Sequence, residues 1–164
     1  INNLAIKSFS QYAGLFGYSN GATIRNVVLG SSCSVVSYYS ITSGYAYVGG
    51  ITGECKDCII ENTANMASVS FTGNASTSLC LGGIVGYLST SNDKEVTIKN
   101  CANYGSVTHS GTAGNTYMGG IIGVSAGSLK KYIQNCLNYG TIITMEQQSI
   151  TWSLIGSIVV YSSS

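Results

Sequence analysis

Charged side chains are scarce in this sequence, and their scarcity excludes several classes of function. Asp, Glu, Lys and Arg make up 8% of the 164 residues and the formal net charge is +1, whereas about 25% of residues are charged in an ordinary globular domain. A chain this neutral lacks the basic field that holds nucleic acid or an anionic membrane. Ser, Thr, Asn, Gly and Tyr must keep it soluble instead, as is common on extracellular β proteins. We therefore expect no nucleic-acid partner and an extracellular or cell-surface location.

Long hydrophobic runs are also absent. No stretch of about eighteen apolar residues occurs, so the sequence predicts no membrane span in this segment. The chain begins with Ile1 rather than with methionine, and it shows no secretory signal peptide. We therefore expect a processed or excised piece, with covalent neighbours in a longer chain.

The residues that usually hold metals or begin catalysis are few. Histidine occurs once, at His109. Cys55 and Cys58 form a CxxC pair, but a zinc site needs a second pair or two histidines at suitable spacing. The HExxH signature of metalloproteases and the GxGxxG signature of dinucleotide binding are absent. We therefore expect no enzymatic activity, no metal and no cofactor.

Glycine, by contrast, is abundant, and it recurs at a regular interval. A glycine-bracketed apolar pentapeptide is followed, about ten residues later, by an apolar–polar–Asn step. The four pentapeptides are AGLFG, GGITG, GGIVG and GGIIG, which end at Gly17, Gly53, Gly86 and Gly123. The closing glycine recurs after 36, 33 and 37 residues, and the asparagine recurs after 36, 38 and 35. A fixed period between about 20 and 50 residues is typical of stacked repeats rather than of one globular core.

The pattern inside each repeat predicts an all-β fold. Apolar and polar residues alternate in short runs such as residues 96–98 and 107–109, whereas helical periodicity is hard to find. We predict a single parallel β-solenoid domain over residues 1–164, with four to five coils of about 36 residues and about three strands in each. The expected coils are approximately 10–45, 46–78, 79–115, 116–150 and a partial coil at 151–164, with uncapped ends.

Equivalent residues of stacked coils are expected to form ladders with a spacing of about 4.8 Å. One inner ladder is predicted from Leu15, Ile51, Ile84, Ile121 and Ile158, and another from Cys33, Val69, Val107 and Ile142. A corner ladder, in which stacked side-chain amides bond to one another or to backbone, is predicted from Asn26, Asn62, Asn100 and Asn135. Gly53, Gly86 and Gly123 suit bends or close approach of neighbouring layers.

Six cysteines are present, and four of them form two candidate disulfides. Cys55 and Cys58 are neighbours in sequence and fit either a local disulfide or two packed thiols. Cys101 and Cys136 fall at one ladder position in neighbouring coils, where a Cα separation of about 4.8 Å permits a disulfide. For this second pair we favour reduced thiols, because in-register parallel pairs do not always offer good disulfide geometry.

Two phrases of the sequence, GGIVG at residues 82–86 and IKNCANYGSV at 98–107, resemble the GLUG-type repeat of bacterial surface proteins and adhesins. The resemblance extends over most of the chain. It is best in the third and fourth copies and weakest in the first, which lacks Cys and Tyr after Asn26. It implies a right-handed parallel β-helix on an exported, cell-surface or fibrous protein. It implies no catalytic residue, because the residues of the motif are structural.

A carbohydrate-directed function is the alternative. Parallel β-helices that cleave polysaccharides need clustered carboxylates, and Glu54, Asp57 and Glu61 lie within one coil. These residues fit a small cation or sugar site, or simply a solvated turn. Tyrosine occurs 12 times, and Tyr104 and Tyr139 are expected to stack in one column. Exposed aromatic columns bind glycans or a partner chain, or they cover loops and stiffen the wall.

Two surface features suggest further partners. Asn74 begins the sequon Asn-Ala-Ser on a predicted loop, which is a glycosylation acceptor in a secretory eukaryote. The run of residues 153–161 is apolar and β-prone and carries no charge or proline. Open parallel edges of this kind pair with further strands, so we expect end-to-end self-association, as an alternative to covalent neighbours. The predicted interface comprises Trp152, Leu154, Ile155, Ile158 and Val160.

The function that the sequence favours is therefore structural or adhesive. We predict a non-enzymatic β-solenoid subunit or segment of an extracellular fibre or cell-surface stalk, which stacks end to end into filaments or continues in a longer chain. The alternative is a glycan-binding or polysaccharide-degrading parallel β-helix, with surface glycans as partners.

Overall fold

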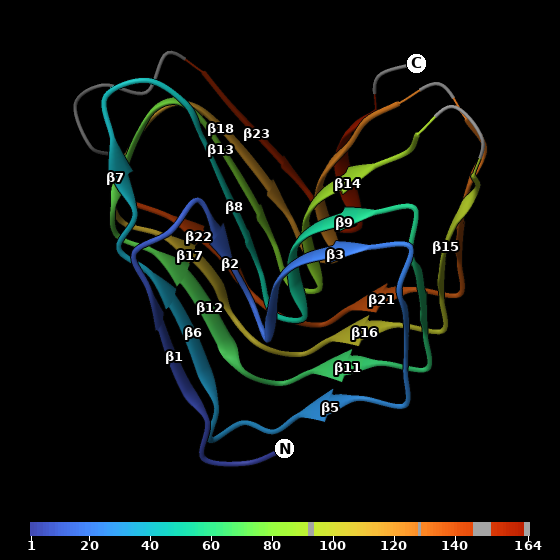
Figure 1. The fold of residues 1–164 in the computed structure, drawn as a ribbon. Helices are drawn as coiled ribbons and strands as arrows, with labels where there is room; N and C mark the ends of the chain where they lie inside the picture. The colour runs from blue at the N-terminus through green and yellow to red at the C-terminus, as the bar shows by residue number, and fades with distance from the viewer. Residues whose placement is uncertain (92–93, 128, 146–151, 163–164) are drawn as a thin grey trace.

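The computed structural model describes the chain except for residues 92–93, 128, 146–151 and 163–164. The described residues form strands β1 to β24 and no helix, and so include no helix long and apolar enough to cross a membrane. Strands of successive coils pair in parallel and build five stacked sheets (Figure 1). The all-β prediction is confirmed, as is the β-solenoid of about four turns with about 36 residues in each.

Each sheet is named here after its first strand. The β1 sheet contains β1 (Ala5–Ser8), β6 (Ser34–Ser37), β12 (Ser68–Phe71), β17 (Val107–His109) and β22 (Ile142–Thr144). The β2 sheet contains β2 (Tyr12–Ala13), β8 (Tyr45–Gly49), β13 (Asn74–Gly82), β18 (Thr112–Gly119) and β23 (Trp152–Gly156), and β7 (Ser40–Ile41) also pairs with β13. The β3 sheet contains β3 (Phe16–Asn20), β9 (Thr52–Lys56), β14 (Val85–Ser89), β19 (Ile122–Ser125) and β24 (Val159–Ser162). The β4 sheet contains β4 (Thr23–Arg25), β10 (Ile59–Glu61), β15 (Val96–Lys99) and β20 (Lys131–Gln134). The β5 sheet contains β5 (Val28–Leu29), β11 (Ala64–Asn65), β16 (Ala102–Asn103) and β21 (Leu137–Asn138).

A full coil contributes one strand to each of the five sheets, where the sequence predicted about three strands. Two of the expected strands each contain a bend. Asn135 has a left-handed backbone conformation, with φ of 51°, and turns the chain between β20 and β21. Gly120 and Ile121 form a second bend, between β18 and β19. The number of strands per coil was therefore underestimated: the bend at Gly120 divides the strand predicted at residues 117–124, and β21 lies beyond the strand predicted at residues 132–136.

The five sheets enclose two apolar cores. The larger core lies between the β3, β4 and β5 sheets, and its fully buried side chains include Ile51, Ile60, Ile84, Ile98 and Ile121. The smaller core lies between the β1 and β2 sheets and includes Val48, Val69, Phe71, Leu81 and Met118. Complete burial of a side chain of this size contributes about 1.5–3 kcal/mol. The in-register stacking of like residues therefore extends both cores from coil to coil.

One predicted ladder is displaced in the first coil. The β1 sheet aligns Val35, and not Cys33, with Val69, Val107 and Ile142. The reason is a longer connection, because residues 30–33 separate β5 from β6, whereas only residues 66–67 separate β11 from β12. Cys33 is nevertheless buried, in the larger core.

Candidate functional site

The β2 and β3 sheets meet at the bend that the paired glycines of the repeat form, such as Gly82 and Gly83, and they diverge from it (Figure 1). We call this the Gly-Gly bend. The bend joins β8 to β9, β13 to β14 and β18 to β19, so each of these coils gives one strand to each wall. In-register pairing places equivalent residues in ladders along the two walls. One wall carries Tyr12, Tyr47, Cys80, Tyr117 and Leu154. The facing wall carries Tyr18, Glu54, Tyr87 and Val124.

The bend requires glycine because neighbouring layers nearly touch there. A Cβ atom on Gly83 would lie 2.2 Å from the carbonyl oxygen of Gly120 and 2.3 Å from the side-chain carbon of Asn103. The three closing glycines would each meet a neighbouring backbone atom at between 2.5 and 2.7 Å: Gly53, Gly86 and Gly123. Contacts below 3.0 Å force something to shift. The glycines of the repeat therefore have a structural role, which is to bring the walls together.

Tyrosine rings interlock between the walls. Tyr47 stacks on Tyr12 with ring centroids 5.7 Å apart, and on Tyr87 of the facing wall with centroids 4.7 Å apart. Tyr12 also contacts Tyr18 of the facing wall, at 5.6 Å. Aromatic pairs of this kind contribute about 0.5–1.5 kcal/mol beyond the area that they bury. The interlocked rings therefore also line the open space between the walls.

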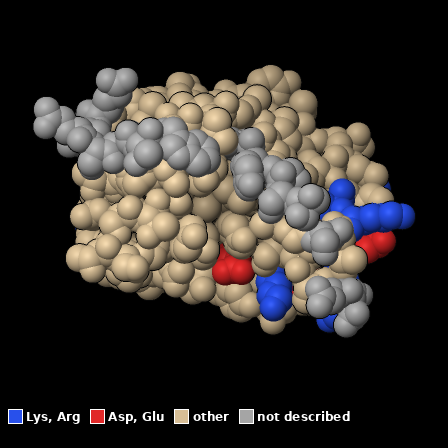
Figure 2. All heavy atoms as spheres, turned by 90° about the horizontal axis from the view of Figure 1, so that it is seen from above, with Lys and Arg blue, Asp and Glu red and all other residues tan. Residues whose placement is uncertain are grey.

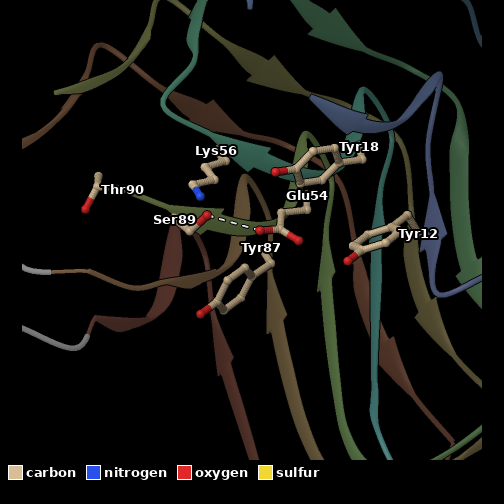
Figure 3. A pocket seen from close by; sticks show the side chains of 7 residues that line it. All are labelled: Tyr12, Tyr18, Glu54, Lys56, Tyr87, Ser89 and Thr90. Carbon is tan, nitrogen blue, oxygen red and sulfur yellow. Dashed lines mark hydrogen bonds between the residues drawn. The ribbon is translucent and has the colours of Figure 1, made fainter. Parts of the chain in front are cut away.

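Two hollows lie between the walls, and together we call them the tyrosine groove. The first has a volume of about 510 Å³, and Figure 3 draws the side chains that line it: Tyr12, Tyr18, Glu54, Lys56, Tyr87, Ser89 and Thr90. The second has a volume of about 430 Å³, and its lining includes Tyr47, Cys80, Tyr87 and Tyr117. Tyr87 belongs to both hollows. Each volume is within the range of about 300–1,000 Å³ that small-molecule sites occupy.

Glu54 is the acidic side chain that lines the first hollow. It is half-buried on β9, and Ser89 Oγ donates a hydrogen bond to Glu54 Oε1 at 3.1 Å (Figure 3). Burial raises the pKa of Glu54, while the Ser89 hydrogen bond and the charge of Lys56 act in the opposite direction. Burial, followed by the charges of neighbouring groups that include Glu54, raises the pKa of Tyr12 and of Tyr87. Both phenols therefore remain protonated at neutral pH and are able to donate hydrogen bonds.

The three acidic residues predicted as a cluster do not converge on one point. Glu54 points into the groove, Asp57 lies at the corner between β9 and β10, and Glu61 lies on β10. Ser91 donates hydrogen bonds to Asp57 from its backbone nitrogen at 2.7 Å and from its hydroxyl at 2.6 Å. Burial raises the pKa of Asp57, but these hydrogen bonds outweigh burial and lower it. Within the described residues, no group of three His, Cys, Asp or Glu side chains is placed to hold a metal ion.

The predicted asparagine ladder lies at a corner of the coil. All four members have a left-handed backbone conformation with φ between 50° and 58°: Asn26, Asn62, Asn100 and Asn135. Asparagine adopts this conformation more readily than most residues. Asn100 Nδ2 donates to Asn62 Oδ1 at 3.0 Å, and Asn135 Nδ2 donates to Asn100 Oδ1 at 3.2 Å. These residues therefore turn the chain and link successive coils.

A second asparagine ladder, which we did not expect from the sequence, runs inside the solenoid. Asn65 and Asn103 are fully buried and Asn138 is partly buried. Asn65 Nδ2 donates to Asn103 Oδ1, and Asn103 Nδ2 donates to Asn138 Oδ1, each at 2.9 Å. Each amide also donates to the carbonyl oxygen two residues later. The sequence feature that could have predicted this ladder is an Asn-x-x-Asn spacing in three copies of the repeat. The first copy lacks it because Leu29 occupies the position of the second asparagine.

All six cysteines are free thiols. A hydrogen bond between Cys55 and Cys58, together with burial, raises the pKa of Cys55, while the same bond lowers the pKa of Cys58 to about 7. Cys101 and Cys136 pair in the same way across neighbouring coils, with the pKa of Cys101 raised and that of Cys136 lowered to about 7. Cys58 is fully buried and Cys136 is half-buried. Both pairs are therefore packed thiols in this structure.

A serine motif also lies near the groove. Residues 17–21, GYSNG, match the G-x-S-x-G pattern, which in α/β-hydrolases exposes a nucleophilic serine at a strand-to-helix turn. Here Ser19 is buried within β3 and accepts a hydrogen bond from Thr52 at 3.3 Å. The described chain has no helix after this strand. The single histidine, which could act as a base for a serine, is His109, and it packs against Phe71 of the smaller core. The motif therefore lacks both the exposed turn and a neighbouring base.

Two predicted surface features lie outside the groove. Tyr104 and Tyr139 stack with ring centroids 5.4 Å apart and 6° between the ring planes, and both rings are exposed. Asn74, which begins the sequon, is exposed at the start of β13.

The predicted polymer interface is only partly described. Leu154 and Ile155 are exposed on β23, and Ile158 is partly buried against the larger core. The side chains of Trp152 and Val160 lie outside the described residues.

The comparisons with known proteins show no family for this chain. No family model matches the chain, and no curated protein matches it. A similar solved structure is the crystal structure of a "putative immunoglobulin A1 protease" from Bacteroides ovatus, with 19% sequence identity and a TM-score of 0.49. The match covers 100% of this chain and 66% of that chain, which is less than two thirds of its length. Similarity at this level carries no argument about activity, and no family match supports the GLUG resemblance. The chain's own stacked parallel sheets show it to be a β-solenoid repeat protein.

Proposed function

We propose that this chain is a non-enzymatic, adhesive segment of an extracellular or cell-surface protein, and that it binds its partner through the tyrosine groove. The pair of facing side-chain ladders is the observation that carries this proposal. The recurring isoleucines pack in the core, the recurring asparagines form the corners and the recurring glycines form the bends. The tyrosines instead line hollows that have space for a ligand. The low charge and the resemblance to GLUG-type surface repeats support the location.

Binding is favoured over catalysis by the chemistry of the groove. Most glycoside hydrolases use a pair of carboxyl groups on either side of the scissile bond. Glu54 lines the first hollow, the described lining of the second hollow includes no acidic residue, and Asp57 accepts hydrogen bonds from Ser91 at a corner of the coil. Polysaccharide degradation is therefore the weaker alternative for this groove.

An adhesion assay tests the proposal. Beads coated with the whole chain are applied to surfaces coated with mucin, fibronectin or a set of immobilised glycans, and retained beads are counted under flow. We expect adhesion to at least one surface, and its loss when Tyr87 is replaced by Ala. Tyr104→Ala is the matched control, because Tyr104 is an exposed tyrosine in a stacked pair outside the groove. Equal adhesion of the two variants, or release of reducing sugar from any of the glycans, would contradict the proposal.

End-to-end stacking is a second candidate function, and an exposed apolar edge favours it. The last described coil contributes an edge strand to each sheet. Exposed apolar side chains of this coil include Leu137, Met145, Leu154 and Ile155. Either a second copy or a covalent neighbour would bury this edge and continue the parallel pairing.

Electron microscopy of the purified chain distinguishes these two occupants. Self-stacking predicts filaments whose fibre diffraction shows an axial repeat of about 4.8 Å. It also predicts that Leu154→Lys and Ile155→Lys weaken assembly. Monodisperse particles at high concentration would exclude self-stacking and leave a covalent neighbour as the remaining candidate to cover the edge.

A further inference from the structure

We propose that the tyrosine groove binds an uncharged polysaccharide chain that lies along the solenoid axis. This inference rests on the proposed adhesive function and adds the chemical class of the ligand. The two hollows share Tyr87 and so lie next to each other across neighbouring coils. Three features of the groove indicate this kind of ligand: its hydrogen-bonding groups, its charge and the spacing of successive coils along it.

The groove offers hydrogen bonds from side chains rather than from the backbone. Its walls are the faces of two sheets whose backbone groups are paired between successive coils. A peptide that binds as an added strand needs an exposed sheet edge, which a paired face does not offer. In the first hollow, the polar groups are phenols, the hydroxyls of Ser89 and Thr90, the Lys56 ammonium and the Glu54 carboxylate (Figure 3). Such donors and acceptors match the hydroxyl groups of a sugar chain.

The charge distribution favours a neutral ligand. Glu54 and Lys56 line the first hollow together, and their opposite charges offset each other. The residues that line the second hollow carry no charge. An anionic chain would therefore meet offsetting charges in the first hollow and no cation among the residues that line the second. The face seen from above has few charged side chains, and those in view lie between its middle and one end (Figure 2).

The spacing of successive coils along the walls suits a repeating ligand. Successive coils are about 4.8 Å apart, which is comparable to the length of one sugar ring in an extended chain. Each coil presents one residue from each wall, so a polysaccharide along the axis meets a new pair of side chains at each ring. The rings of Tyr12, Tyr47 and Tyr87 brace one another, so their hydroxyl groups are held before the ligand arrives. Preorganisation of this kind lowers the entropic cost of binding.

Recognition is expected to depend most on Tyr87 and Glu54. Tyr87 lines both hollows, and its loss would also release Tyr47. Glu54 is held by Ser89 and supplies a charged acceptor, which makes hydrogen bonds roughly twice as strong as neutral ones.

Affinity electrophoresis of the whole chain tests the inference. Native gels contain hydroxyethylcellulose, dextran or mannan, and a further gel contains carboxymethylcellulose, which has the cellulose backbone but carries negative charge. We expect at least one neutral polysaccharide to retard the protein, and carboxymethylcellulose to retard it about tenfold more weakly or not at all. Tyr87→Ala and Glu54→Gln are expected to weaken retardation about tenfold. Tyr87→Phe keeps the stacked ring and removes only the hydroxyl, so it should also weaken binding without disturbing the fold, whereas Tyr104→Ala should have no effect.

The outcomes separate this inference from the adhesive function on which it rests. Retardation by none of the neutral polysaccharides overturns the inference, and so does equal retardation of the wild type, Tyr87→Ala and Tyr87→Phe. If coated beads adhere, lose adhesion with Tyr87→Ala and are not displaced by neutral polysaccharide, the groove is adhesive but its ligand is not of this class. If the beads adhere to no surface, the proposed function itself fails.

Discussion

Asparagine has two separate tasks in the second, third and fourth copies of the repeat. At the outer corner, residues such as Asn100 hold a left-handed backbone conformation and bond to their neighbours near solvent. Inside the solenoid, Asn103 is fully buried and bonds to the amides of Asn65 and Asn138 and to a backbone carbonyl. The Cβ position of Gly83 is filled by the Asn103 side chain. The Gly-Gly pair and the inner asparagine of each repeat therefore depend on each other.

Replacing the inner asparagine should cost far more stability than replacing the outer one. Asn103→Ala deprives the buried Asn65 amide and the partly buried Asn138 amide of one partner each, and a buried unsatisfied group costs about 1–3 kcal/mol. We expect the free energy of unfolding to fall by about 3 kcal/mol in denaturant titrations. Asn100→Gly is the matched control, because glycine keeps the left-handed conformation, and a loss below about 1 kcal/mol is expected. Equal losses would show that the inner ladder is not a principal support of the coil.

His109 should make stability depend on pH. It is fully buried, and neither of its ring nitrogens has a hydrogen-bond partner among the described residues. Burial lowers its pKa below the usual value of 6.5. As the pH falls through 6.5, the unfolded chain binds the proton first, so stability is lost from that pH down to the native pKa. We expect the unfolding free energy to fall between about pH 7 and pH 5. The fall should be smaller in His109→Leu, and an unchanged pH slope in this variant would contradict the explanation.

At the scale of elements, the Gly-Gly bend determines where the two walls meet. A Cβ atom on Gly83 has no space, whereas one on Gly17 would meet its nearest neighbour, the Tyr12 carbonyl oxygen, at 3.4 Å. Gly83→Ala should therefore destabilise the chain by about 3 kcal/mol or prevent folding. Gly17→Ala should be neutral or stabilising by up to about 1 kcal/mol, because it restricts the unfolded chain. Thermal unfolding of both variants measures the difference, and a well-folded Gly83→Ala would show that the layers are not in close contact.

The period and the inner apolar ladder of this fold could be predicted from the sequence, but its bends and its groove could not. The spacing of Gly53, Gly86 and Gly123 is visible in one chain, and so is the ladder of isoleucines that it accompanies. The left-handed conformation of Asn135 and the bend at Gly120 divide strands without changing the period. The longer connection before β6 shifts the register by two positions, so Cys33 was placed wrongly.

The groove was missed because its residues are not identical in successive coils. At one wall position, Cys80 interrupts a column of tyrosines, and at the facing position, Glu54 separates two tyrosines. A search for recurring residues finds neither column. The tyrosine groove appears only when the two sheets are brought face to face by the bend, which is a property of the coil and not of any one repeat.

At the scale of the whole molecule, two cores support the two walls of the tyrosine groove. The larger and smaller cores lie behind the β3 and β2 sheets, so both groove walls have packed apolar layers behind them. The register of five parallel sheets fixes the spacing of side chains along the groove. Adding coils to such a solenoid would lengthen the groove and the number of ligand units that it meets. An adhesive repeat protein gains affinity from length in this way.

The most direct test of the tyrosine groove as the binding surface is a carbon-13 NMR spectrum of the chain labelled on its tyrosine rings. Spectra are recorded before and after addition of short, soluble fragments of whichever neutral polysaccharide retards the protein. The account predicts that the ring signals of Tyr12, Tyr47 and Tyr87 shift, whereas those of Tyr104 and Tyr139 do not. Shifts confined to Tyr104 and Tyr139, or no shifts under conditions where the fragments bind, would contradict it.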